Sequence, residues 1–591
     1  MHLLSYLSIT SSFSAAAAVA VSQRDYSAPT AVTKNGTYGG VYVSEYDQDL
    51  FLGIRYAQKV VRFTRAEPVN ETWNDIKPLT EYKEHCYGYG IAWTGSNADW
   101  SGYPMSEDCL YLNIIRPAGL TNTSELPVAM WIHGGGFTKG GGSDKRYNYS
   151  NAVQESVNMG KPFIGITINY RLSAWGWLMG KEAQEAGAVN LGYHDMRQAL
   201  RWVNENIAAF GGDPAKVTIV GESCGAEALA AQILAYGGRD DGLFRAAIGE
   251  SGFGGRVPRP WPGGLNGTVA HQKVFDRLVN ATSCTATVGT AQAIKCLKDV
   301  PTEELNHAIN ATGNTLWAPV FDGDFIQDYP SNQFRDGRFV RVPILIGCNS
   351  DEGAYFRGIN GNANVTILNT DADFEAMVLP MFDTNDKVLA STGKTVDQLL
   401  GEITTSYPNI QSVGIPNLVA WPEVVNQDTP DLQYLGLQDR RGNAFGGDYT
   451  NIAWRRSSNI YWSKHQIPNW SYRFDARADG ILPNVSAQHF GEVAYVFNNV
   501  LGNGYRIKPL VSEENRRLAK EVSAAWINMI TGLNPNGAGV KPTWPVYNAT
   551  VGGGVGQNMV FNKQGSFVEY DDFRAEALAW WHSHFLDLMG T

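Results

Sequence analysis

Apolar residues in the central third of the chain fall into short continuous runs, and stretches with helical periodicity separate them. The runs predict strands at Leu126–Ile132, 162–170, 216–220, 244–248 and 342–346. The stretches between them predict helices over 192–210 and 226–235. Continuous apolar strands that alternate with helices indicate an α/β protein, with a mostly parallel central sheet covered by helices on both faces.

The flanking regions have other patterns. Residues 39–56 show short polar–apolar alternation, which predicts an antiparallel addition at one edge of the sheet. Residues 371–466 are mixed and are expected to form helical cover over the sheet, and the Pro/Gly-rich stretches 254–267 and 358–369 are expected to be surface loops. Since no repeat, heptad or low-complexity block interrupts the chain after its N-terminal stretch, we expect one large domain over residues 21–591.

Composition narrows the functional classes. Of 591 residues, 43% are hydrophobic and only 18% are charged, so the chain can bury a large core and general disorder is excluded. The formal net charge of −11 argues against a nucleic-acid partner, because affinity for phosphates depends on clustered Lys and Arg. No apolar run long enough to span a membrane occurs in the body of the chain, and no CxxC or HExxH pattern suggests a metal. We expect no cofactor.

The N-terminus predicts secretion. Residues 1–22 are apolar, rich in small residues and free of acids, which is typical of a signal peptide over residues 1–20, with cleavage between Ala18 and Ser22. Only His2 supplies basic character, so a disordered tail is the other interpretation. Eleven Asn-x-Ser/Thr sequons support passage through a glycosylating compartment: Asn35, Asn70, Asn122, Asn148, Asn266, Asn280, Asn310, Asn364, Asn469, Asn484 and Asn548.

One motif points to nucleophilic catalysis. The sequence Gly221-Glu222-Ser223-Cys224-Gly225 follows a predicted strand and precedes a predicted helix, as a G-x-S-x-G nucleophile elbow requires. The sharp turn would present the Ser223 hydroxyl at the carboxyl end of the sheet, beside the positive end of a helix. A glycine-containing turn without catalytic function is the other interpretation.

A second glycine-rich segment supplies a candidate oxyanion hole. His133-Gly134-Gly135-Gly136-Phe137 follows the strand Leu126–Ile132, so it is expected at another strand's carboxyl end. Glycines let backbone N–H groups face a pocket with no Cβ in the way, and we assign the N–H groups of Gly135, Gly136 and Cys224 to this hole.

The remaining catalytic partners are expected downstream of the serine, first an acid and then a histidine. The predicted strand 342–346 leads to Asp351 and Glu352, and the residues alone do not separate these two. Among the downstream histidines, His489 lies in a loop after the predicted strand Asn469–Phe474, where a base belongs, and His465 remains an alternative. His582 and His584 lie in a predicted terminal helix over 571–585 and are expected to be core or surface residues.

The chain resembles the type-B carboxylesterase/lipase family, which includes cholinesterases and fungal extracellular lipases. The matching stretches run over almost the whole chain and include Ser106-Glu-Asp-Cys-Leu-Tyr-Leu-Asn113, the segment 133–137, Asn169-Tyr-Arg171, the segment 210–214, the elbow, Asp351-Glu-Gly353 and His489-Phe-Gly-Glu492. The resemblance implies an α/β-hydrolase fold and a triad of Ser223, Glu352 and His489. Six cysteines allow fifteen pairings, and the resemblance implies the disulfides Cys86–Cys109 and Cys284–Cys296 and an ion pair between Arg62 and Glu107.

Three features depart from the family pattern. Cys224 follows the nucleophile where the family usually has alanine, and its larger side chain is expected to narrow the pocket. A cysteine nucleophile at this position is disfavoured, because the elbow presents its central residue. Arg55 replaces a usual proline, and the loop between Cys86 and Cys109 is short for a lipase and carries Tyr87, Tyr89, Trp93, Trp100 and Tyr103.

The functional hypothesis is a secreted serine hydrolase that cleaves small-molecule or lipid carboxylic esters through a covalent acyl-enzyme. A triacylglycerol lipase with interfacial activity is the first alternative. A catalytically inactive, cholinesterase-like adhesion or binding protein is an alternative from a different class. The sequence leaves acyl-chain length, alcohol preference and oligomeric state open.

Overall fold

We describe a computed structural model of the chain. It describes residues 28–89, 103–254, 268–313, 317–354, 367–379, 393–410, 436–481 and 486–585. The predicted signal peptide, Trp93 and Trp100, and most of the two predicted surface loops lie outside these residues.

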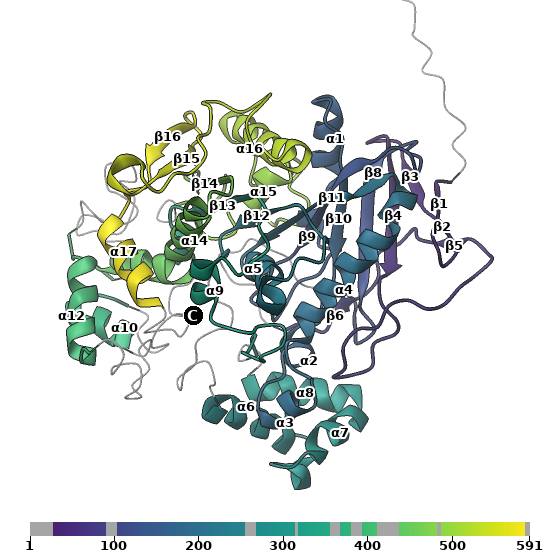
Figure 1. The fold of residues 1–591 in the computed structure, drawn as a ribbon, viewed down its shortest axis with the longest axis horizontal. Helices are drawn as coiled ribbons and strands as arrows, with labels where there is room; N and C mark the ends of the chain where they lie inside the picture. Colours follow the sequence, from purple (N-terminus) through teal and green to yellow (C-terminus); the bar gives the residue numbers. More distant parts are fainter. Residues whose placement is uncertain are drawn as a thin grey trace, which may run out of the picture.

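An eleven-stranded sheet forms the centre of the described part (Figure 1). Its strand order is β16 (Phe567–Tyr570), β15 (Gln557–Phe561), β14 (Asn469–Phe474), β13 (Ile344–Asn349), β12 (Ala246–Glu250), β11 (Gly212–Glu222), β9 (Leu126–Ile132), β10 (Ile164–Ile168), β8 (Tyr111–Pro117), β4 (Gln48–Arg55) and β3 (Val41–Val43). The strands from β10 to β15 are parallel, whereas β8, β4 and β3 form an antiparallel N-terminal edge. Both features confirm the predicted architecture, and antiparallel β16 extends the other edge.

Side chains of the sheet alternate between two cores, as the two-residue period of a strand requires. In β9, Met130 and Ile132 belong to one hydrophobic cluster, and Ala129 and Trp131 belong to the other. Helices α4 (Leu191–Asn206) and α5 (Cys224–Gly238) pack in the first cluster, and α16 (Glu513–Gly532) and α1 (Ser150–Asn158) contribute to the second. Helices therefore cover both faces of the sheet.

Two helical groups lie beyond the sheet (Figure 1). Helices α6 (Thr268–Asn280), α7 (Gln292–Asp299) and α8 (Thr302–Gly313) gather at the lower end of the view, near α3 (Lys181–Glu185) and α2 (Ser173–Gly176). Helices α10 (Asp371–Val378), α12 (Val396–Ser406) and α17 (Ala575–His584) gather at the left. With α13 (Asp439–Gly447) and α14 (Ala453–Lys464), they hold a third hydrophobic cluster that includes Phe374, Phe445 and Trp581.

The remaining described elements are short. Helices α9 (Pro330–Asp336) and α15 (Val493–Val496) border the sheet. One small sheet contains β1 (Thr30–Val32), β2 (Thr37–Gly39) and β5 (Lys77–Pro78). A second small sheet pairs β6 (His85–Cys86) with β7 (Met105–Ser106). The terminal helix was predicted from residue 571, but α17 begins at Ala575. The difference arises because Asp571 is buried in an ion pair with Arg455, so it cannot begin a surface helix.

Candidate active site

Parallel strands of the central sheet bring the predicted site residues to one edge. Since β11, β12, β13 and β14 are parallel neighbours, their carboxyl ends meet at this edge. Ser223 follows β11 directly, Glu352 lies just beyond β13, and His489 lies in the loop that follows β14. The N–H of Asp351 donates to the carbonyl of Ala487 at 2.9 Å, so the acid and histidine segments are joined by their backbones.

Ser223 occupies a strained turn between β11 and α5. Its φ of 57° and ψ of −131° lie outside the regions that ordinary residues favour, and its N–H donates to the carbonyl of Glu250 at 2.9 Å. A side chain at Gly225 would collide with the carbonyl oxygen of Ile132, so glycine is required where the elbow packs on β9. Ser223 is partly exposed, whereas the residues on either side of it are buried.

Glu352 and His489 form a buried pair, with 2.6 Å between Oε2 of Glu352 and Nδ1 of His489. Four groups surround the carboxylate. Oε1 accepts hydrogen bonds from the Ser251 hydroxyl and from the N–H of Asn349, both at 2.6 Å. Oε2 accepts a further bond at 2.8 Å from the side-chain amide of Asn451. Bonds of this kind stabilise the ionised carboxylate, so Glu352 can hold the imidazole in one orientation.

The other nitrogen of His489 faces the elbow. Nε2 lies 3.1 Å from Oε1 of Glu222, the residue that precedes Ser223. Burial raises the pKa of Glu222 well above its usual value, and the nearby carboxyls of Glu492 and Glu250 add to the shift. Burial also raises the pKa of Glu492 to about 7, with a further contribution from Glu352. Glu352, on the Nδ1 side of the ring, instead has hydrogen-bond donors on both of its oxygens.

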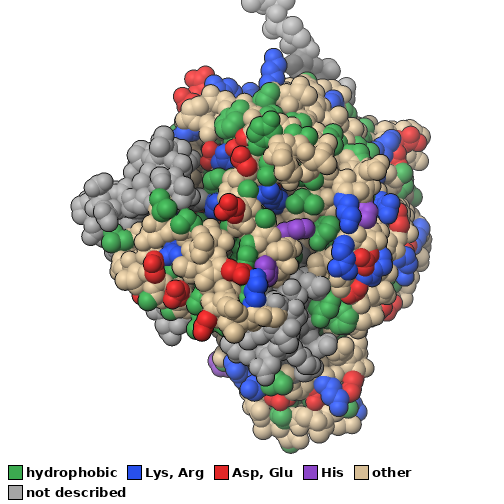
Figure 2. Space-filling model, turned by 60° about the vertical axis from the view of Figure 1, so that its left-hand side comes forward, with side chains coloured by type: hydrophobic (Ala, Val, Ile, Leu, Met, Phe, Trp, Pro, Cys, Tyr) green, Lys and Arg blue, Asp and Glu red, His purple; other side chains and the backbone are tan. Residues whose placement is uncertain are grey.

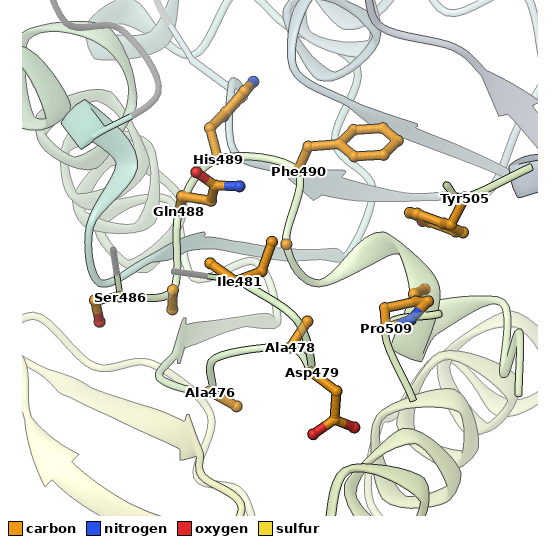
Figure 3. Close-up of a pocket in the computed structure, with 13 residues that line it drawn as sticks. Ala476, Ala478, Asp479, Ile481, Ser486, Gln488, His489, Phe490, Tyr505 and Pro509 are labelled. Carbon is orange, nitrogen blue, oxygen red and sulfur yellow. The ribbon is translucent and has the colours of Figure 1, made fainter. Parts of the chain in front are cut away.

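His489 and Phe490 lie in one loop, which lines a small pocket and determines where the histidine ring points. Figure 3 shows the rings of His489 and Phe490 leaving one loop in different directions, with the Phe490 ring extending on the side of Tyr505. Phe490 has a φ of 71°, and the guanidinium carbon of Arg146 lies 4.6 Å from the centre of its ring. Phe490 therefore forms a left-handed turn directly after His489, and its ring is held by Arg146. The turn leaves the His489 ring directed toward Glu222 at the end of β11.

The glycine-rich segment after β9 lies against Ser223. A Cβ at position 134 would come within 2.9 Å of the Ser223 Cβ, so the segment approaches Ser223 this closely only with glycine at this position. Gly135 and Gly136 have φ values of 103° and 67°, and their N–H groups make no backbone hydrogen bond within the described residues. The assignment of these N–H groups to an oxyanion hole stays a prediction, with which this geometry is compatible.

Cys224 has a structural role that the sequence did not show. Its side chain is buried, and Sγ accepts a hydrogen bond from the N–H of Phe137 at 3.1 Å, with the Tyr170 hydroxyl at 3.8 Å. The thiol therefore supports the backbone of the glycine-rich segment. The narrowing of the pocket by this side chain stays a prediction.

The other candidates lie elsewhere. Asp351 is buried, its Oδ2 accepts from the N–H of Ser486 at 3.4 Å, and burial beside Asp439 raises its pKa to about 7. Nε2 of His465 lies 2.9 Å from the carbonyl of Phe334. His582 contacts the Ser457 hydroxyl, and His584 contacts the carbonyl of Trp580. The geometry thus favours Glu352 and His489 among the candidates.

Two disulfides match the pairings that the family resemblance implies. Cys86 is bonded to Cys109, and Cys284 to Cys296. Arg62 pairs with Glu107 and also donates to the carbonyls of Leu297 and Val300, so it joins the two disulfide-bonded segments. Arg55, which stands where the family usually has proline, forms an ion pair with Asp108 at 2.6 Å.

Sequence reasoning missed Ser251 and Asn451. Ser251 follows β12 directly, and Asn451 lies in a π-helical turn over Asp448–Ile452 between α13 and α14. The position of Ser251 after a parallel strand was a usable signal. Asn451 had none, because its side chain reaches Glu352 only through the irregular turn.

Within the described residues, no group of three or more His, Cys, Asp or Glu side chains could hold a metal ion. The helices of the same part include none that is long and apolar enough to cross a membrane.

The sheet, the elbow and the buried acid–histidine pair define an α/β-hydrolase. The Carboxylesterase family matches residues 27–555, and the chain belongs to that family. It is a carboxylic ester hydrolase.

Relatives agree with this assignment. The chain is 31% identical over 578 residues to Lipase 5 of Diutina rugosa, covering 93% of this chain and 94% of that protein. It is 32% identical over 486 residues to Secreted lipase 1 of Botryotinia fuckeliana, covering 79% and 75%. Among solved structures, EstA of Aspergillus niger is similar with a TM-score of 0.73 and 25% identity, over 95% of this chain and 99% of that one.

Proposed function

We propose that this protein is a secreted serine hydrolase that cleaves carboxylic esters through a covalent acyl-enzyme. Ser223 is the nucleophile, His489 the general base, and Glu352 the acid that orients the base. The observation that carries the proposal is the His489 ring, whose Nδ1 lies 2.6 Å from Glu352 while Nε2 faces the β11 end that carries Ser223.

The first half of the reaction acylates the enzyme. Oγ of Ser223 attacks the ester carbonyl carbon, and its proton passes to Nε2 of His489. The carbonyl oxygen becomes an oxyanion and accepts hydrogen bonds from the N–H groups of Gly135, Gly136 and Cys224. The bond to the alcohol oxygen then breaks, and His489 returns the proton to the leaving alcohol.

The second half releases the acid. Water gives a proton to His489 and attacks the acyl carbon, and a second tetrahedral intermediate forms in the same oxyanion hole. Its collapse breaks the bond to Oγ, and His489 protonates Ser223. Throughout, the Glu352 carboxylate stabilises the imidazolium that forms in each half.

The direct test compares Ser223→Ala with Cys224→Ala in hydrolysis of p-nitrophenyl butyrate. Loss of the nucleophile is expected to lower kcat by at least about 10³-fold. Cys224→Ala keeps the backbone N–H and is expected to retain most activity. Substantial turnover by Ser223→Ala, or inactivity of the well-folded Cys224→Ala enzyme, would overturn the assignment.

A triacylglycerol lipase is the second candidate, and the names of the fungal relatives favour it. The test is hydrolysis of tributyrin and triolein across their solubility limits. A sharp rise in rate at the oil–water interface, with activity on triolein, would support a lipase. A rate that saturates below the solubility limit would support an esterase for soluble substrates.

Secretion and domain organisation are part of the proposal. We expect residues 1–20 to be removed as a signal peptide and residues 21–591 to form a single hydrolase domain. The name of the Botryotinia fuckeliana relative supports secretion. N-terminal sequencing of protein recovered from the medium tests it, and a chain that retains residues 1–20 would contradict it.

A further inference from the structure

A second cavity lies away from the catalytic serine, on the side of the molecule where α12 and α17 gather (Figure 1). Its volume is about 570 Å³, within the range typical of small-molecule sites. Residues at the end of α12, in the first turns of α13 and around the start of α17 line it. Figure 2 brings this side forward and shows apolar, basic and acidic side chains interspersed there.

Arg440, in the first turn of α13, contributes an unusual charge to this cavity. The residue is only 5% exposed, and Nη1 of its guanidinium has no hydrogen-bond partner in the described part of the chain. The two other arginines of the lining are paired, Arg441 with Asp371 and Arg574 with Asp448. Arg440 is therefore the cavity's unneutralised buried cation.

A buried guanidinium without a counter-ion is costly, because arginine cannot lose its proton to escape the penalty. Its position adds to the cost, since the first turn of a helix carries partial positive charge and favours anions. The carboxylates of the lining, Asp572 and Glu576, are exposed at its rim. An anion bound inside the cavity would neutralise Arg440, and the planar guanidinium suits a carboxylate.

The rest of the lining indicates the body of the ligand. Apolar surface comes from Ile410, Leu437, Ala444, Phe573 and Ala577, beside the polar groups of Gln438 and Ser406. An inorganic anion would leave most of this apolar surface and volume unused. A charged head attached to an apolar chain would satisfy both parts.

We propose that this cavity is a second ligand site, which binds an amphipathic carboxylate of the fatty-acid type with its head on Arg440 and its chain along Leu437 and Phe573. The ligand could be an acid released by ester cleavage or one taken from the surroundings. Because the proposal concerns binding, it stands apart from the proposed catalytic mechanism.

The first test measures binding in the Ser223→Ala background, where no turnover occurs. Isothermal titration with decanoate is expected to show saturable binding that weakens at least tenfold in Arg440→Met and is largely restored in Arg440→Lys. Decanol and inorganic phosphate are each expected to bind at least tenfold more weakly than decanoate. Arg456→Met is the matched control, because Arg456 is also buried, its Nη1 likewise has no hydrogen-bond partner among the described residues, and it lies outside the lining.

The second test locates the ligand. A photoreactive fatty acid that carries a diazirine is expected to label peptides containing residues 437–444 or 573–577, and the label should be lost in Arg440→Met. Equal decanoate affinity in Arg440→Met, labelling confined to peptides near residue 223, or tighter binding of phosphate than of decanoate would each overturn the proposal. Ala575→Phe, which would fill the cavity, should also abolish labelling and leave ester hydrolysis unchanged. Labelling that persists in Ala575→Phe would contradict the proposed site.

The source of the carboxylate is tested separately. If the acid comes from ester cleavage, the active wild-type enzyme incubated with a decanoate ester should retain decanoate after rapid gel filtration, and Arg440→Met should not. If wild type retains decanoate only when the free acid is added, the surroundings are the source. Retention in neither case would overturn the site.

Discussion

The two carboxylates that face the His489 ring lie in regions built in opposite ways. At the end of β13, Glu352 accepts bonds from Ser251, Asn349 and Asn451 besides its contact with His489. At the end of β11, Glu222 is equally buried, its Oε1 lacks a well-aligned hydrogen-bond donor in the described residues, and burial raises its pKa well above the usual value.

This difference shows how one histidine can have two unlike neighbours. Donors placed around a buried carboxylate favour its charged form, whereas burial without them favours the neutral acid. Glu352, with donors on both oxygens, is expected to stabilise the imidazolium, and Glu222, whose pKa burial raises, is expected to add little negative charge beside Nε2, which receives the Ser223 proton in the proposed mechanism. The comparison predicts that substitutions of Glu352 lower kcat far more than substitutions of Glu222.

The largest effect is expected for Glu352→Gln. The substitution keeps the shape but removes the charge and places the wrong hydrogen-bonding group opposite Nδ1, so kcat should fall by about 10³- to 10⁴-fold. Steady-state kinetics on p-nitrophenyl butyrate check this, with the thermal transition as a folding control. A loss below tenfold in a folded enzyme would remove Glu352 from the triad.

A smaller effect is expected for Asn451→Leu. The change removes one donor from Oε2 of Glu352 and loosens the carboxylate, so kcat should fall about tenfold, comparable to the loss of one hydrogen bond to a charged group. KM should stay the same, because Asn451 acts through Glu352 rather than on the substrate. A change confined to KM would contradict this positioning role.

At the other end of the ring, Glu222→Gln should have a weak effect. If Glu222 is protonated at neutral pH, glutamine replaces it with a similar neutral group, and kcat at pH 7 should fall by less than about tenfold. The same kinetic assay measures it. A loss as large as that of Glu352→Gln would show that Glu222 works as a charged group, and the contrast between the two regions would fail.

The smallest effect concerns stability. Because the pKa of Asp351 is raised to about 7 in the folded state, the native protein holds a proton that the unfolded chain loses near pH 4. Stability is therefore lost as the pH rises from 4 through 7. Asp351→Asn should remove this loss and raise Tm by about 3 °C at pH 8, with almost no change at pH 4. A Tm difference that is the same at both pH values would contradict the assignment.

The sequence predicted the regular strands that position the candidate site. Leu126–Ile132 and Asn469–Phe474 coincide with β9 and β14, and the elbow was expected from its strand, glycines and helix. The two strand predictions are confirmed, and the parallel sheet brings the carboxyl ends of these strands to one edge. The choice between Asp351 and Glu352 needed the family resemblance, since neighbouring residues differ only in where the turn after β13 points them.

Irregular backbone explains what the sequence did not predict. Asn451 reaches Glu352 from a π-helical turn, and the Cys224 thiol accepts a hydrogen bond from the N–H of Phe137. Arg440 likewise belongs to a cavity formed by segments far apart in the chain. Such contacts depend on long-range packing, for which local periodicity carries no signal.

The most direct measurement is covalent labelling of the protein with a fluorophosphonate, followed by mass spectrometry of the intact chain and its peptides. One adduct per chain on Ser223 is expected, with a labelling rate at least about 10³-fold lower in His489→Ala. An adduct on Cys224 or on another serine, or full-rate labelling of Ser223 without His489, would contradict the central claim.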